Sequence, residues 1–281
     1  GPTVTVNGAY QIVTGDFNAD TKQDVLWYAP GTAADTLWLA TTDGHFATGP
    51  TVNVNGSYTP VVGDFNGDGA DDIVWYGPGA GADAVWIADG NGRFHGGPAL
   101  TVNGSYVPIV GDFNGDGFDD IFWYAPGAPS EALWSGSVNG LHATATFAVN
   151  GTYTPFVGDF NADGYSDIFW YAPGAGADGI WLSNGLGTFW SGPPVNVNGT
   201  YKPVVGDFNS DGLTDILWYA PGAGTDWLWP GKVGGGFAPG TMAPQVTGTY
   251  VPRPGDFDGD GRTDVLWYGP GSTPDALWIA R

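Results

Sequence analysis

Short apolar runs, separated by clusters of Gly, Pro, Asn and Asp, form the main pattern of this chain. Between two successive acidic loops four such runs occur, for example over residues 58–65, 72–76, 84–88 and 93–102. They are rich in β-branched and aromatic residues, and no segment has a helical period of useful length. Each run therefore predicts a β-strand and each cluster a turn.

The four-run pattern is a repeat. Each copy contains Gly-Asp-Phe, further acidic residues and then Trp-Tyr-x-Pro-Gly, and the first aspartates lie 47 to 49 residues apart: Asp16, Asp64, Asp112, Asp159, Asp207 and Asp256. So regular a period indicates one supersecondary unit that is stacked on copies of itself. Four strands in each radial unit predict an all-β fold, a six-bladed β-propeller with four antiparallel strands per blade, as a single domain over residues 1–281.

The two ends of the sequence carry complementary parts of the repeat. The chain begins within what other copies use as a fourth strand, at residues 3–8, and stops after a third strand at residues 276–280. We therefore expect the N-terminal strand to complete the last blade, which leaves no open sheet edge. A closed propeller of this kind is expected to be a monomer.

Composition narrows the class of protein. Aromatic residues make up 15% of the chain and the 49 glycines recur at fixed places, which argues against disorder. The absence of cysteine excludes disulfides and thiolate chemistry. Seven Lys and Arg against a net charge of −22 argue against a nucleic-acid partner, and no run of 18 apolar residues suggests a membrane span. We expect a secreted, extracellular protein.

The acidic loops have the donor pattern of a calcium site. Counted from the first Asp, side-chain oxygens stand at positions 1, 3, 5 and 9, and Gly follows at position 6 in five of the six loops. Such oxygens are hard ligands that suit calcium, and position 7 is expected to add its backbone carbonyl. About six calcium ions, one per blade, are predicted. The expected ligands are Asp16, Asn18, Asp20, Lys22 and Asp24; Asp64, Asn66, Asp68, Ala70 and Asp72; Asp112, Asn114, Asp116, Phe118 and Asp120; Asp159, Asn161, Asp163, Tyr165 and Asp167; Asp207, Asn209, Asp211, Leu213 and Asp215; and Asp256, Asp258, Asp260, Arg262 and Asp264.

The loops are not EF-hands, because position 12 is Trp in every copy and the flanking segments are strands. A set of metal-free Asn/Asp-Gly turns is the alternative. The six sites are not expected to be equal. Thr21 replaces the Gly at position 6 of the first loop, whereas Asp258 gives the sixth loop four carboxylates. The first site should bind calcium most weakly and the sixth most strongly.

These motifs resemble a known family. The Gly-Asp-Phe-Asn-Gly-Asp-Gly-x-x-Asp loop is followed by Ala-Pro-Gly at 29–31, 125–127, 172–174 and 220–222, with Gly-Pro-Gly at 77–79 and 269–271. They are similar to the FG-GAP (VCBS) repeats of integrin α-subunit propellers and of many secreted bacterial proteins. The resemblance implies a propeller with calcium on the loops between first and second strands. Similar repeats build a fungal N-acetylglucosamine-binding lectin and propeller domains of polysaccharide lyases.

Other repeated residues are candidates for ligand binding. The Trp residues at 11 and 22 positions after each first Asp are better explained as packing between blades, although stacked Trp faces can also bind sugars. Polar ligand candidates lie at the strand ends opposite the calcium loops, and two aromatic residues break the repeat. The candidates are Tyr10, Tyr58, Tyr106, Tyr153, Tyr201 and Tyr250; the acidic residues Asp35, Asp83, Glu131, Asp178, Asp226 and Asp275, whose alternative role is to cap turns; and Trp190 and Trp227.

Catalysis has little support, because the three histidines occupy turns and no Ser-His-Asp or Cys-His set can be assembled. The sequence therefore predicts a non-catalytic calcium-binding module with a glycan or cell-surface ligand, most simply a lectin-like carbohydrate-binding protein. The alternatives are a structural or protein-interaction propeller, with a protein partner, from a larger secreted protein, and a polysaccharide-active enzyme.

Overall fold

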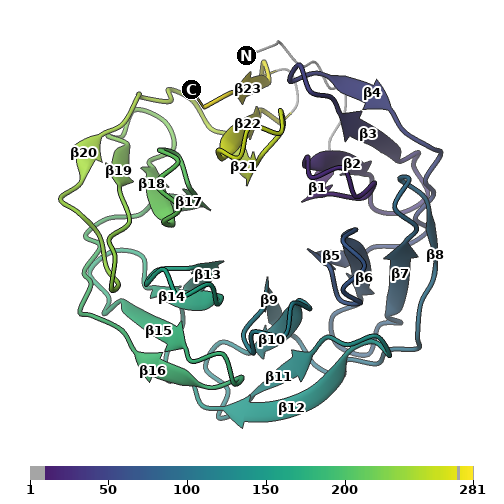
Figure 1. Cartoon of the computed structure of the whole chain (residues 1–281), viewed down its shortest axis with the longest axis horizontal. Coiled ribbons are helices and arrows are strands. Elements are labelled where there is room, and N and C mark those ends of the chain that lie inside the picture. The colour runs from purple at the N-terminus through teal and green to yellow at the C-terminus, as the bar shows by residue number, and fades with distance from the viewer. Residues whose placement is uncertain (1–9, 271–272, 281) are drawn as a thin grey trace. The chain divides into compact units, whose positions relative to one another are not determined.

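The computed structural model describes residues 10–270 and 273–280, and within them the chain forms 23 β-strands and no helix (Figure 1). These strands make six antiparallel sheets, each of consecutive strands in chain order. The predicted all-β fold of six propeller blades is thus confirmed. None of the described residues forms a helix long and apolar enough to cross a membrane.

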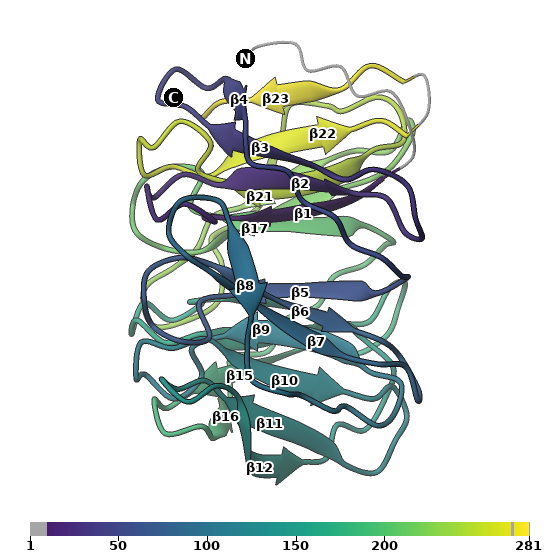
Figure 2. The same cartoon turned by 90° about the vertical axis from the view of Figure 1, so that its right-hand side faces the viewer.

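The blades fall into two compact units, which are described separately. Unit 1 comprises the described parts of residues 1–106, 136–142 and 251–281, and unit 2 comprises residues 107–135 and 143–250. Unit 1 holds blade 1 (β1, Gln11–Gly15; β2, Asp24–Tyr28; β3, Thr36–Ala40; β4, Phe46–Thr48), blade 2 (β5, Thr59–Gly63; β6, Asp72–Tyr76; β7, Ala84–Ala88; β8, Phe94–Gly96) and blade 6 (β21, Val251–Gly255; β22, Asp264–Tyr268; β23, Ala276–Trp278). Figure 2 shows the strands of blades 1 and 2 from the side.

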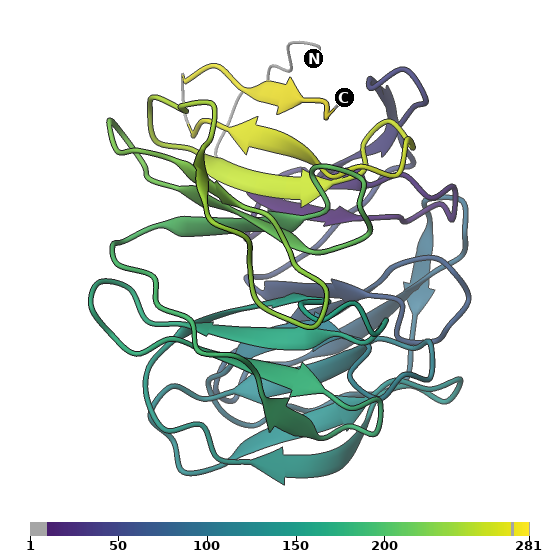
Figure 3. The same cartoon turned by 60° about the vertical axis from the view of Figure 1, so that its left-hand side comes forward.

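Unit 2 repeats the same plan in three four-stranded blades, whose green and teal strands come forward in Figure 3. They are blade 3 (β9, Val107–Gly111; β10, Asp120–Tyr124; β11, Glu131–Ser135; β12, His142–Phe147), blade 4 (β13, Thr154–Gly158; β14, Asp167–Tyr171; β15, Gly179–Ser183; β16, Phe189–Ser191) and blade 5 (β17, Lys202–Gly206; β18, Asp215–Tyr219; β19, Trp227–Trp229; β20, Thr241–Met242).

The predicted fourth strand is too long. The sequence predicts residues 93–102 in blade 2, whereas β8 ends at Gly96. Pro98 follows soon after and has no amide to donate to a sheet, so the ladder with β7 stops there. The rest of the run continues as an extended connection whose Val102 is buried.

The second strand of each blade forms the centre of the packing. All five residues of β2, β6, β10, β14, β18 and β22 are buried. Trp27 in β2 is 1% exposed and meets Trp38 of β3 edge-on, with ring centroids 5.3 Å apart. Equivalent pairs recur in the other blades, for example Trp75 with Trp86. The Trp residues at these positions therefore belong to the packed interior, as the sequence indicates.

A tyrosine at the end of each second strand forms hydrogen bonds with the backbone of the segment that leads into the next blade. The Tyr28 hydroxyl donates to the Gly56 carbonyl over 2.8 Å and accepts from the Tyr58 amide over 2.9 Å. The equivalent hydroxyls of Tyr76, Tyr124, Tyr171 and Tyr219 make the same two contacts. Neighbouring blades within each unit are thus joined by repeated hydrogen bonds as well as by apolar packing.

Blade 6 has three strands among the described residues, in the order β21-β22-β23. The strand that the sequence predicts to complete it, at residues 3–8, lies outside the described residues.

Candidate functional site

The side chains of each acidic loop accept hydrogen bonds from the backbone amides of the same loop. In blade 2, Asp64 Oδ1 accepts from the amides of Gly67 and Asp68 over 2.7 and 3.1 Å, and its Oδ2 accepts from Gly69 over 2.9 Å. Asn66 Oδ1 then accepts from the Asp68 amide. Each of these hydrogen bonds uses only one of the lone pairs of the accepting oxygen. The same oxygens therefore remain able to bind a metal ion.

In all six loops the amide at position 6 donates to Oδ2 of the first Asp. In blade 6, one oxygen from each of Asp256, Asp258 and Asp260 lies within 4.8 Å of the others. Carboxylate and amide oxygens at such separations fit a hard divalent cation, and calcium accepts six to eight of them. The residues that would hold the ion are the side chains at positions 1, 3, 5 and 9 of each loop, as the sequence predicts, with the position 7 carbonyl.

The carboxylate at position 9 lies deepest in the loop. Asp72 is fully buried, and its Oδ1 accepts from the Ala88 amide over 3.0 Å. Its Oδ2 is also buried and has no hydrogen-bond donor. A buried carboxylate oxygen without a donor is costly unless a cation lies close to it. In blade 2 this oxygen therefore fits the calcium prediction better than it fits a metal-free turn. In the other five loops the equivalent Oδ2 accepts from the amide at position 2, as Asp24 Oδ2 does from Phe17 over 3.1 Å.

Burial also changes the titration of these carboxylates. Desolvation raises the pKa of Asp24, Asp72 and Asp167 to about 7, and that of Asp264 to about 6. The backbone amides that bind these groups lower the pKa in part, while the neighbouring loop carboxylates raise it further. The metal-free folded protein therefore keeps protons on these groups at pH values where the unfolded chain has lost them.

We predict that acid favours the metal-free fold and weakens calcium binding. The pKa of these carboxyls is higher in the folded metal-free protein than in the unfolded chain. Their contribution to the free energy of unfolding is therefore fully present below a pH of about 4 and is lost as the pH rises to about 7. Lowering the pH from about 7.5 to about 5.5 should raise the melting temperature of the chelated protein. It should also weaken calcium binding, since a proton must leave. Titration calorimetry in buffers of different ionisation enthalpy would count those protons, and binding without proton release would contradict this account.

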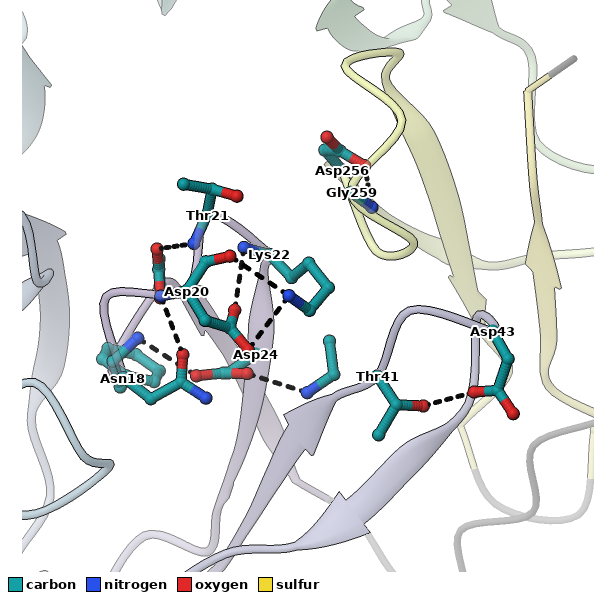
Figure 4. A network of polar contacts seen from close by, with 12 residues as sticks. Asn18, Asp20, Thr21, Lys22, Asp24, Thr41, Asp43, Asp256 and Gly259 are labelled. Atoms are coloured by element: carbon teal, nitrogen blue, oxygen red, sulfur yellow. Dashed lines mark hydrogen bonds and ion pairs between the residues drawn. The ribbon is translucent and has the colours of Figure 1, made fainter.

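The loop of blade 1 differs from the others in two residues. Thr21 has a φ of 71°, in the left-handed region where the other loops have Gly at 78 to 88°. Lys22 brings its Nζ to 3.0 Å from Asp20 Oδ2 and 3.1 Å from the Asp20 carbonyl, so a side-chain cation already contacts a predicted ligand (Figure 4). The sequence predicts only a carbonyl from Lys22, and the structure adds its ammonium.

The first site should therefore empty first, and the sixth last, as calcium is withdrawn. A β-branched residue in the left-handed region costs about 1–2 kcal/mol, which corresponds to roughly tenfold in affinity. Thr21→Gly and Lys22→Met should each tighten the first site, because they remove the strain and the competing ammonium. Metal occupancies in crystals soaked in graded chelator would show the order. A first site as full as the sixth throughout would contradict it.

Each repeat has an acidic residue in the hairpin after the second strand, and its carboxylate accepts hydrogen bonds from backbone amides. Asp35 Oδ1 accepts from Ala29 over 2.8 Å and its Oδ2 accepts from Val54 over 2.6 Å. The carboxylates of Asp83, Asp178 and Asp226 each accept two amides in the same way, Glu131 accepts from the Val149 amide, and Asp275 accepts from the Gly269 amide. These contacts are those of the turn-capping alternative, so the six carboxylates do not enter the site proposed below.

The six repeated tyrosines are half-buried. Most lie over the Gly two residues earlier, as the ring of Tyr58 lies over Gly56. Tyr201 also lines a pocket in unit 2 together with Trp227. Trp190 is 66% exposed on β16 and does not line that pocket.

The pocket at Trp227 has a volume of about 420 Å³. Its aromatic walls are Tyr201, Trp218, Trp227 and Trp229, and the exposed Asn196 and Asn198 stand at its edge. Positions equivalent to Trp227 hold Thr36, Ala84, Ala132, Gly179 and Ala276, so this blade alone places a large ring there. The sequence singles out Trp227 and Tyr201 as ligand candidates but neither asparagine, because Asn198 belongs to an Asn-Gly turn that recurs in other repeats and is explained by that turn.

A family model describes these repeats. The FG-GAP-like repeat matches residues 16–75, 64–123, 159–218 and 207–267. The chain belongs to the FG-GAP-like repeat family. No curated protein matches it by sequence.

Solved structures resemble this FG-GAP-like chain in fold. A lectin from Agrocybe aegerita, described as recognising non-reducing terminal N-acetylglucosamine, matches with a TM-score of 0.66 and 17% identity over 96% of this chain and 79% of the lectin. The Aleuria aurantia lectin, solved with Fucα1-6GlcNAc, matches with a TM-score of 0.53 and 12% identity over 99% and 97%. The Photorhabdus luminescens Tc holotoxin pore matches with a TM-score of 0.62 and 20% identity over 96% of this chain, but only 14% of the toxin chain. At these identities the likeness concerns the fold.

Proposed function

We propose that this FG-GAP-like propeller is an extracellular, calcium-binding, non-catalytic module that binds carbohydrate. The observation that carries the proposal is the pocket of unit 2, where Trp227 and Tyr201 lie beside the packing residues Trp218 and Trp229 and two exposed asparagines. Aromatic faces pack against the apolar faces of sugar rings, and amide groups donate to and accept from hydroxyls. The fold shared with two lectins supports the same assignment.

The predicted calcium affinity supports an extracellular location. Extracellular calcium modules bind with dissociation constants of about 10⁻⁴–10⁻³ M, which fits loops that are largely exposed to solvent. Such loops fill outside cells, where calcium is abundant. The ions would hold the turns between first and second strands rather than touch the sugar, because the aromatic pocket is built from β18, β19 and the segment before β17.

A glycan array with the calcium-loaded protein tests the proposal, and Trp227→Ala tests the pocket. Losing a stacking ring should weaken binding by about tenfold or more, since aromatic contacts of this kind contribute roughly 1–2 kcal/mol. Trp190→Ala is the matched control, because it removes an exposed tryptophan of the same unit that lies outside the pocket. Equal losses in both variants would contradict the assignment of the pocket.

The alternative is a structural or protein-interaction propeller. Leu186 and Val233 are 79% and 76% exposed in turns between third and fourth strands of unit 2, and such apolar tips also suit a protein partner. An array without any hit would favour this alternative. Several hits within one sugar family would favour the lectin-like function.

A further inference from the structure

One position of the repeat changes from apolar to charged. The third residue of the first strand is Val13, Val61, Ile109, Phe156 and Val204 in blades 1 to 5, but Arg253 in blade 6. In unit 1, Val62, the fourth residue of β5, packs against the apolar cluster that contains Val13. In the contact between blades 6 and 1 that fourth position is Thr14. A polar pair therefore replaces an apolar one.

The guanidinium of Arg253 is held by backbone carbonyls alone. Its Nε donates to the Ile12 carbonyl and its Nη1 to the Pro252 carbonyl, each over 3.3 Å. Among the described residues no carboxylate pairs with it, and residues 1–9 and 271–272 contain no Asp or Glu. A guanidinium has five N–H donors, and the contacts with the described residues use two of them, which leaves three for another acceptor within this part of the chain.

Burial makes this arrangement costly. Desolvation lowers the pKa of Arg253, and no carboxylate among the described residues opposes it. A partly buried charge without a counter-ion is unfavourable, whereas an aliphatic residue at this position packs well in the other blades. An anion at the free N–H groups removes the penalty.

A pocket opens where these groups meet. It has a volume of about 530 Å³ and is lined by β21, β1, β5 and the end of β22, with Tyr10, Gln11, Thr14, Thr59, Arg253 and Tyr268 as its polar residues. Hydroxyl and amide groups thus surround one cation, and no acidic residue lines the pocket. A pocket of this size takes a small organic molecule.

We propose that this pocket binds the carboxylate of a sugar acid, a hexuronate that is free or the end residue of a polyuronate chain. The free N–H groups of Arg253 would meet the carboxylate in a forked arrangement. Thr14, Thr59 and Gln11 would meet the ring hydroxyls. A hydroxylated ligand is favoured over a simple anion because the polar lining is uncharged apart from Arg253.

Titration calorimetry with the calcium-loaded full chain tests this site. Galacturonate and a trigalacturonate should bind, whereas galactose and the methyl ester of galacturonate, which lack the charge, should bind at least tenfold more weakly. A trimer that binds no better than the monomer indicates a site for the free acid, and a tighter trimer indicates a chain end. These comparisons use the native protein and do not depend on any variant folding.

Variants assign the binding to Arg253. Arg253→Met restores the apolar character of the other blades and should weaken galacturonate binding at least tenfold, while Thr14→Val should weaken it less. Lys202→Met is the control, because it removes another first-strand cation, in unit 2. Trp227→Ala should leave galacturonate binding unchanged, which separates this site from the aromatic pocket. The proposal is overturned if galacturonate does not bind, if its ester binds equally well, or if Arg253→Met binds like the native protein.

Discussion

Removing calcium with a chelator should lower the melting temperature of this protein by well over about ten degrees. At a tenfold excess of calcium over its dissociation constant, each site contributes roughly 1.4 kcal/mol to the free energy of unfolding. Six sites would together contribute on the order of 8 kcal/mol, which is comparable with the whole stability of a typical domain. For a chain of this length each kcal/mol shifts the melting temperature by about two degrees or more.

The physical reason is the charge of the loops. With a net charge of −22 and seven basic residues, the metal-free protein has few cations to offset its acidic loops. Differential scanning calorimetry with chelator, and then with calcium restored, would measure the effect. Magnesium is the matched control, because its strict octahedral geometry suits these loops less well. An unchanged melting curve after chelation would contradict the calcium assignment.

The parts of this fold that the sequence predicts are those repeated in every blade. Strands such as β6 are short, apolar and bounded by turn residues, so their limits are visible in the sequence. The requirement at position 6 of the acidic loops is likewise local, and the positive φ of Gly69 and of Thr21 confirms it. The fourth strand was less predictable, because its end depends on where Pro98 interrupts the ladder.

The parts that the sequence could not predict depend on contacts between distant segments. The Lys22 ammonium lies against Asp20 of its own loop, and the aliphatic part of the side chain lies beside Gly259 in the loop of blade 6, which no local pattern reports. Likewise, Asp35 bonds Val54, a residue 19 positions away, so its role could not be separated from that of a ligand-binding group in advance. The pocket around Trp227 needs Asn198 from the preceding connection, although Trp227 itself is visible as a departure from the repeat.

Replacing Asp35 with Ala should strongly lower the free energy of unfolding. Asp35 is 7% exposed, and replacing it with Ala leaves the buried amides of Ala29 and Val54 without acceptors. Hydrogen bonds to charged groups contribute about 1.5–3 kcal/mol each, so the free energy of unfolding should fall by about 3–5 kcal/mol. Asp35→Asn should fall nearly as far, because its amide nitrogen would face one of the two donors.

Asp43→Ala is the matched control for this experiment. Its carboxylate belongs to the same blade but is 72% exposed, so its loss should leave the free energy of unfolding almost unchanged. Urea unfolding monitored by tryptophan fluorescence would measure both variants, with calcium present throughout. Because Asp35 joins the hairpin of blade 1 to the segment that enters blade 2, its loss should loosen both. If Asp35→Ala were as stable as the native protein and instead lost carbohydrate binding, the carboxylate would be a ligand-binding group rather than a cap of the turn.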